Sequence, residues 1–125
     1  MTVFDHVDLR VADVERCRQF YDAFLREYGF RGKTQPDGAQ LYYRLEEREV
    51  REVIVVSADP EHRPTATCLA FRAETRADVD RIAAVAEAAG ARAFEAPGPC
   101  PEYTESYYAA FFEDPDGNRL EVVCR

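Results

Sequence analysis

Two stretches of the chain carry apolar residues at the spacing of an amphipathic helix. In the first stretch these residues recur three or four positions apart: Val14, Cys17, Tyr21, Phe24 and Tyr28. The second stretch repeats the pattern with smaller side chains: Val79, Ile82, Ala83 and Ala86. Residues at these intervals share one face of a helix, so each stretch predicts a helix that packs its apolar face on a core.

Residues at both ends of each stretch fit the start and stop of a helix. Asp13 precedes the first helix as an N-cap, and Gly29 follows it at a position that favours a left-handed backbone. The second helix has Thr75 as its N-cap, with Asp78 three positions later in the manner of a capping box. Gly90 then ends this helix as Gly29 ends the first.

Short strand-like segments precede and follow each predicted helix. A β-rich segment precedes each helix, at 3–11 and 66–73. Three more follow each helix, at 30–34, 40–45 and 51–57 and at 91–94, 107–112 and 118–124. The sequence Asp114-Pro115-Asp116-Gly117 predicts a tight turn before the last segment. Residues 96–104 are rich in proline and predict a stiff loop.

The chain contains an internal repeat. His6-Val7-Asp8-Leu9-Arg10-Val11 recurs as Cys68-Leu69-Ala70-Phe71-Arg72-Ala73, and each copy runs into a predicted helix. We therefore expect a single α+β domain over 1–125, built from two βαβββ modules. Module one spans 1–58, a linker with two prolines spans 59–64, and module two spans 65–125.

Composition narrows the possible partners. The 125 residues carry a net charge of −8, and no basic run interleaves with aromatic residues, so we expect no nucleic-acid partner. No apolar stretch is long enough to span a membrane, and no secretory signal begins the chain. The four cysteines show no paired metal-ligand spacing. We interpret them as free thiols and expect a cytoplasmic location.

Three segments carry a resemblance to a known family. They are Phe4-Asp5-His6-Val7, Phe20-Tyr21 and Asp114-Pro115-Asp116-Gly117-Asn118-Arg119-Leu120-Glu121. With the paired modules, they resemble the vicinal oxygen chelate superfamily, which includes glyoxalase I, extradiol dioxygenases and bleomycin-resistance proteins. The resemblance implies a curved, cup-shaped mixed sheet with helices on the outside, a divalent metal in many members, and frequent homodimers.

The resemblance also implies where metal ligands would lie. Matched to the family pattern, the first-strand positions are His6 and Cys68, and the last-strand positions are Ile54 and Glu121. We predict that His6, Glu121 and Cys68 hold a divalent ion (Zn, Fe, Mn or Ni) and that Glu121 is also catalytic. A thiolate favours zinc over ferrous iron. Ile54 cannot ligate, which argues against glyoxalase I chemistry.

Aromatic residues mark an expected substrate pocket. Tyrosines are paired at 42–43 and 107–108, so one of each pair should face the interior of the cup. We predict that Tyr43, Tyr103 and Tyr108, together with Ile54, contact a small-molecule ligand. Packing at a sheet edge or in a dimer is the structural alternative for these tyrosines.

The sequence is compatible with two functions. The first is a metal-dependent lyase, isomerase or dioxygenase that acts on neighbouring oxygens of a small substrate. The second is a metal-free protein that binds and sequesters a small molecule, as bleomycin-resistance proteins do. Ile54 and Cys68 favour the second, whereas the matched positions of His6 and Glu121 favour the first. Structural alternatives also exist: Glu121 as a solvated charge, His6 as a hydrogen-bonded residue and Cys68 as a small buried hydrophobe.

Overall fold

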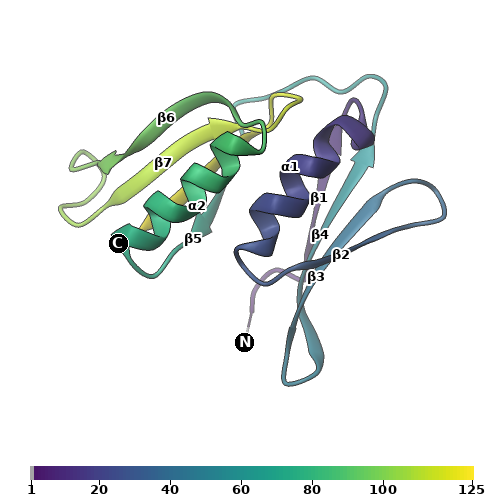
Figure 1. Cartoon of the computed structure of the whole chain (residues 1–125), viewed down its shortest axis with the longest axis horizontal. Helices are drawn as coiled ribbons and strands as arrows, with labels where there is room; N and C mark the ends of the chain where they lie inside the picture. Colours follow the sequence, from purple (N-terminus) through teal and green to yellow (C-terminus); the bar gives the residue numbers. More distant parts are fainter. Residues whose placement is uncertain (1) are drawn as a thin grey trace. The chain divides into compact units, whose positions relative to one another are not determined.

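The computed structural model describes residues 2–125. The chain divides into two compact units, one ending at Arg63 and the other beginning at Pro64. Each unit holds one helix and one four-stranded mixed sheet (Figure 1). This confirms the prediction of two βαβββ modules in an α+β chain. The unit that ends at Arg63 is module 1, and the unit that begins at Pro64 is module 2.

Module 1 follows the predicted order of elements. Along the chain these are β1 (His6–Val11), α1 (Val14–Arg26), β2 (Arg31–Thr34), β3 (Gln40–Glu46) and β4 (Glu49–Ala58). The sheet order is β1-β4-β3-β2. β1 pairs with β4 in parallel, whereas the other pairs are antiparallel. Strand β2 therefore forms one open edge of this sheet, and α1 packs on β2, β3 and β4.

Module 2 repeats the same arrangement. Its elements are β5 (Cys68–Arg72), α2 (Arg76–Ala88), β6 (Arg92–Pro99), β7 (Tyr108–Glu113) and β8 (Arg119–Cys124). The sheet order is β5-β8-β7-β6, with β5 parallel to β8. Helix α2 packs on β6, β7 and β8. The sequence repeat is thus a repeat of topology.

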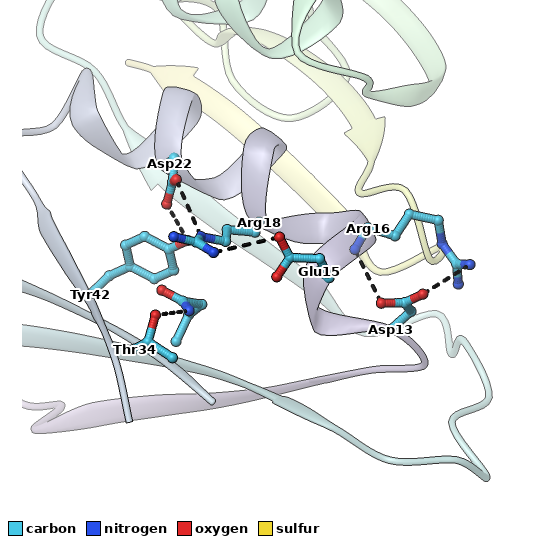
Figure 2. Close-up of polar contacts among 8 residues, drawn as sticks. Asp13, Glu15, Arg16, Arg18, Asp22, Thr34 and Tyr42 are labelled. Carbon is cyan, nitrogen blue, oxygen red and sulfur yellow. Dashed lines mark hydrogen bonds and ion pairs between the residues drawn. The ribbon is translucent and has the colours of Figure 1, made fainter. Parts of the chain in front are cut away.

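Both helices begin at the predicted caps. The Asp13 carboxylate accepts a hydrogen bond from the backbone N–H of Arg16, with 3.2 Å between Oδ1 and N (Figure 2). Thr75 and Asp78 form the complete capping box of α2. A cap of this kind contributes about 1 kcal/mol, because it satisfies backbone donors that have no partner inside the helix.

The apolar face of each helix builds the core of its own module. In α1 the buried residues are Cys17, Phe20, Tyr21, Phe24 and Leu25. In α2 they are Val79, Ile82, Ala83 and Ala86. Burying a side chain the size of leucine or phenylalanine stabilises the fold by roughly 1.5–3 kcal/mol. The larger side chains of α1 give module 1 the more aromatic core.

The turn between β7 and β8 is fixed by a buried aspartate. Oδ1 of Asp114 accepts hydrogen bonds from the backbone N–H groups of Asp116 and Asn118, each at 2.9 Å. Gly117 has φ +95°, a left-handed conformation that glycine adopts without strain. The predicted turn is confirmed, and it sets the pairing of β7 with β8.

Strand β6 runs further than the sequence indicates. Residues 96–99 belong to β6, although the prolines there predict a loop. Because β6 is an edge strand, one side of its backbone has no neighbouring strand. A proline, which lacks an N–H group, can lie there without removing a hydrogen bond from the sheet. The pairing of β6 with β7 is irregular at two places.

No helix within residues 2–125 has both the length and the apolar character needed to cross a membrane.

Candidate functional site

Strand β8 places Glu121 on the sheet face that α2 does not cover. Its neighbours in sequence, Leu120 and Val122, are buried on the opposite face because side chains alternate along a strand. In the register of the sheet, Glu121 lies opposite Phe111 of β7 and Ala70 of β5. Glu121 is nevertheless only 7% exposed. A carboxylate on the open face of module 2 is thus shielded from water.

Tyr107 binds one oxygen of this carboxylate. Its hydroxyl donates a buried hydrogen bond to Oε1 of Glu121. Burial and this hydrogen bond raise the pKa of Tyr107 to about 12. Tyr107 therefore keeps its proton at neutral pH and acts as a donor to Glu121.

Cys68 lies beside the other oxygen. The distance from its Sγ to Oε2 of Glu121 is 4.0 Å. Burial raises the pKa of the Cys68 thiol, and the Glu121 carboxylate raises it further. Cys68 is therefore a protonated thiol at neutral pH as long as no cation binds beside it.

No positive side chain neutralises Glu121 directly. Within module 2, all of which the structure describes, Glu121 makes no ion pair with an arginine, lysine or histidine nitrogen, and its contacts are those with Tyr107 and Cys68. A buried carboxylate without a cation is energetically costly. The arrangement can therefore accept a positive ion.

An aromatic surface extends from this site. The rings of Tyr103 and Tyr107 lie with their centroids 4.9 Å apart, and the Arg125 guanidinium carbon lies 5.1 Å from the centroid of the Tyr107 ring. A hollow of about 420 Å³ adjoins it, lined in part by Tyr103 and Phe111. This volume is sufficient for a small molecule. Tyr103, one of the predicted ligand contacts, lies at this hollow.

His6 lies on β1 of module 1. Its ring is 53% exposed, and its Nδ1 lies 2.9 Å from the carboxylate of Asp5. The hydrogen bond with Asp5 raises the pKa of His6. Val53 of β4 pairs with His6 of β1 on one side and with Tyr43 of β3 on the other. The predicted residues His6 and Tyr43 thus lie on the same face of module 1, one strand apart.

The strand register corrects the match between Ile54 and Glu121. Cys68 pairs with Arg119 and Ala70 with Glu121, whereas His6 pairs with Val53 and Asp8 with Val55. If His6 corresponds to Cys68, the counterpart of Glu121 is Val55. Ile54 corresponds to Leu120 and is buried, as Leu120 is. The sequence match was off by one residue, but the module 1 position is apolar in either alignment.

The structure also distinguishes the two adjacent tyrosines of module 2. The hydroxyl of Tyr108 donates to Asp80 of α2 at 2.7 Å, and Arg76 of α2 lies over its ring. Tyr108 is therefore on the helix side of the sheet, and Tyr107 is the tyrosine that contacts Glu121. The sequence predicted Tyr108 of this pair as a ligand contact, whereas the structure places Tyr107 beside Glu121 and Tyr108 beside α2.

Among residues 2–125, no group of three or more histidine, cysteine, aspartate or glutamate side chains is arranged to hold a metal. Module 2 contributes two such donors close together, Cys68 and Glu121, whereas His6 belongs to module 1.

Fold and sequence together identify the family. Residues 3–122 match the Glyoxalase/Bleomycin resistance protein/Dioxygenase superfamily, and the chain belongs to this family. The resemblance seen in the sequence is thereby confirmed.

Individual relatives cover nearly the whole chain. The uncharacterized protein YqjT from Bacillus subtilis is 29% identical, over 94% of this chain and 95% of its own length. A glyoxalase/bleomycin resistance protein from Albidiferax ferrireducens has 25% identity and a TM-score of 0.77, covering 99% of this chain and 100% of the other.

A second similar structure contains a metal. It is a mutant of the fosfomycin resistance protein FosX from Listeria monocytogenes, complexed with Mn(II) and 1S,2S-dihydroxypropylphosphonic acid. The TM-score is 0.69 over 98% of this chain and 89% of the other, with 15% identity. At this identity the likeness shows the fold alone.

Proposed function

We propose that this protein is a divalent-metal-dependent enzyme that acts on neighbouring oxygens of a small substrate. The observation that carries the proposal is the buried carboxylate of Glu121, which has the Cys68 thiol beside its second oxygen and, among residues 2–125, no cationic side chain bound to it. A divalent ion would supply the missing positive charge. Family membership and the Mn(II) bound to the FosX relative are consistent with this proposal.

Cys68 and Glu121 are suitably spaced to share one ion. Metal–sulfur and metal–oxygen bonds of about 2.3 and 2.1 Å put the two donor atoms roughly 3.6 Å apart in a tetrahedral site. The observed separation of 4.0 Å is close to that value. Tyr107 would hold Glu121 in orientation from outside the ligand set, as hydrogen-bonded neighbours of metal ligands commonly do. The donor pair therefore fits a metal.

His6 is our proposed third ligand. Its Nδ1 is already bound to Asp5, which leaves Nε2 for an ion. A carboxylate behind a ligating histidine is a common arrangement in metal sites. We propose that His6 supplies this nitrogen to the ion that Cys68 and Glu121 hold. A Cys-His-carboxylate set with an open position favours zinc, with Fe, Mn and Ni as the alternatives.

The chain's own groups define the chemistry of the site. When bound, the ion would act as a Lewis acid on substrate oxygens. Glu121 is the carboxylate that can accept a proton from the substrate, while Tyr107 keeps its proton and donates to Oε1. Val55 occupies the position in module 1 that Glu121 occupies in module 2, so this position supplies no second carboxylate ligand.

The substrate is proposed to bind along the aromatic surface. Tyr103 is exposed and offers a ring face, the buried Tyr107 ring packs beside it, and Arg125 adds a positive charge over the ring of Tyr107. These groups favour a small, partly planar molecule over a long polymer. Tyr43 on the same face of module 1 as His6 is a further proposed contact.

A second function is supported by the same surface. The hollow beside Tyr103 and the nearby buried carboxylate of Glu121 could also bind a cationic or aromatic molecule without a metal. The family that the chain belongs to includes bleomycin resistance proteins. In that case Glu121 would pair with a positive group of the ligand. The two functions differ in their response to a chelator.

Metal analysis of the protein purified without chelator tests the proposal. We expect close to one equivalent of a divalent ion, lost in Glu121→Gln, Cys68→Ser and His6→Ala. The matched controls are Glu105→Gln, an exposed glutamate, and His62→Gln, the only other histidine. Both controls should retain the ion. An ion retained by all three ligand variants would reject the assignment, and ligand binding that survives EDTA in metal-free protein would support the second function.

We further propose a homodimer in a reducing compartment. Each sheet has two outer strands, which are β1 and β2 in module 1 and β5 and β6 in module 2. Exposed strand edges tend to pair with another polypeptide chain unless they are protected. The four cysteines are free, which is consistent with a cytoplasmic location. Light scattering in solution would measure the mass, and a monomer at micromolar concentration would contradict the dimer.

A further inference from the structure

Module 1 contains a second hollow that the proposed metal site does not use. It has a volume of about 380 Å³ and lies between α1 and the edge strand β2. Four cationic residues line it: Arg18 and Arg26 from α1, and Arg31 and Lys33 from the edge strand β2. In the register of β2, Arg31 and Lys33 alternate with Gly32, so their side chains start from the face opposite Tyr42 and contribute charge at the open edge of the strand. The single carboxylate in its lining is Asp22. This excess of positive charge occurs in a chain whose net charge is −8.

Asp22 is already bound and does not neutralise the other cations. Its Oδ1 accepts a hydrogen bond of 2.7 Å from the hydroxyl of Tyr42, and Arg18 lies 3.9 Å from its other oxygen (Figure 2). Arg18 also reaches Glu15 at 3.5 Å. Among residues 2–125, Arg26, Arg31 and Lys33 make neither an ion pair nor a side-chain hydrogen bond. Three charges at this hollow therefore have no partner among the described residues.

The inner wall of the hollow is built from buried polar side chains. Tyr42 is 2% exposed and Gln40 is 4% exposed, and both line the hollow. Nε2 of Gln40 donates to Oγ1 of Thr34 at 2.6 Å, which leaves the Thr34 hydroxyl proton for another acceptor. A cluster of exposed charges on a flat surface would lack such a wall.

Gly32 allows this wall to form. Gly32 and Tyr42 are partners across β2 and β3, and a Cβ on Gly32 would lie 2.8 Å from Cε1 of Tyr42. That distance is shorter than real contacts, so a larger residue would displace the tyrosine ring. The Tyr42 ring lies beside Gly32 of β2, and its hydroxyl reaches Asp22 on α1.

We propose that this hollow binds the phosphate group of a small phosphate monoester. A phosphate dianion accepts several hydrogen bonds at once, and arginine side chains bind it through paired N–H groups. Arg26, Arg31 and Lys33 supply charge, and Thr34 supplies a hydroxyl donor. The volume of the hollow suits a small molecule, whereas a nucleic acid needs an extended basic surface.

Calorimetric titration at low ionic strength tests the proposal, with inorganic phosphate and glycerol 3-phosphate as probes. We expect saturable binding of both and no binding of glycerol. The variant Arg26→Ala/Arg31→Ala, which changes two exposed residues on different elements, should bind at least tenfold more weakly. Amide NMR shifts caused by phosphate should be confined to α1, β2 and β3.

The control variant is Arg48→Ala/Arg63→Ala. It removes two exposed arginines of the same module from outside the hollow, so it changes the net charge equally. An equal loss of binding in this control would show general charge attraction and overturn the proposal. Absence of saturable phosphate binding in the unmodified protein would also overturn the proposal. Self-association of Arg26→Ala/Arg31→Ala would then show that these arginines only protect the edge of β2 from pairing with another chain.

The phosphate site can be separated from the metal site. Glu121→Gln should leave phosphate binding unchanged, because Glu121 belongs to module 2 and does not line this hollow. Loss of phosphate binding in this variant would contradict a site confined to α1, β2 and β3.

Discussion

The hydroxyl of Tyr107 donates a hydrogen bond to Oε1 of Glu121, and both groups are buried in module 2. Tyr107 precedes β7, and Glu121 lies in the middle of β8. This contact gives the proposed site its one fixed carboxylate. It also separates the roles of two neighbouring residues, because Tyr108 binds Asp80 on the other side of the sheet.

Replacing Tyr107 with phenylalanine should destabilise the protein by about 1–3 kcal/mol, because the buried Glu121 carboxylate loses its donor. Urea unfolding of both proteins measures this difference. Tyr103→Phe is the matched control, since the structure records a ring contact for Tyr103 but no hydroxyl hydrogen bond among the described residues. Equal stability of Tyr107→Phe and the unmodified protein would show that water replaces the hydroxyl.

The stabilisation by Tyr107 should disappear at alkaline pH. Its pKa is raised to about 12 in the folded protein, against about 10 for an ordinary tyrosine. Below pH 10 both folded and unfolded states keep the proton, so the contribution is complete. As the pH rises from 10 through 12, the unfolded state loses the proton first, and the contribution falls. The difference in unfolding free energy between the unmodified protein and Tyr107→Phe should therefore shrink between pH 9 and pH 11.5.

Cys68 should react slowly with alkylating agents at neutral pH. Burial and the Glu121 carboxylate raise its pKa, so little of the reactive thiolate is present. The pH midpoint of iodoacetamide modification should lie above that of a free cysteine, and Glu121→Gln should move it down. Mass spectrometry of the modified peptide distinguishes Cys68 from the three buried cysteines. An unchanged midpoint in Glu121→Gln would mean that the carboxylate has no influence on the thiol.

Alanine should be tolerated in place of Gly98 but not in place of Gly32. Gly32→Ala places a Cβ 2.8 Å from the Tyr42 ring and should cost about 1–3 kcal/mol through overpacking. Gly98→Ala is the control, because nothing lies within 4 Å of a Cβ there and its φ is not positive. Thermal unfolding of the two variants tests the difference. Similar melting temperatures would show that the ring of Tyr42 moves without loss.

Much of the fold follows from local sequence signals. Asp13 and Thr75 specify where the helices begin, and the Asp114 turn specifies the hairpin between β7 and β8. These signals act over a few residues, so they can be read without knowing the rest of the structure. The family resemblance rests on the same segments.

The sequence by itself determined two βαβββ modules, their helices and the positions of His6, Cys68 and Glu121 on the strands. Tertiary structure decided that Val55 and not Ile54 corresponds to Glu121, and that Tyr107 and not Tyr108 contacts it. It also decided that Arg26, Arg31 and Lys33 line one hollow. The physical reason is that a shift of one residue in strand pairing moves every side chain to the other face of the sheet, and the pairing is set by contacts between segments far apart in the chain.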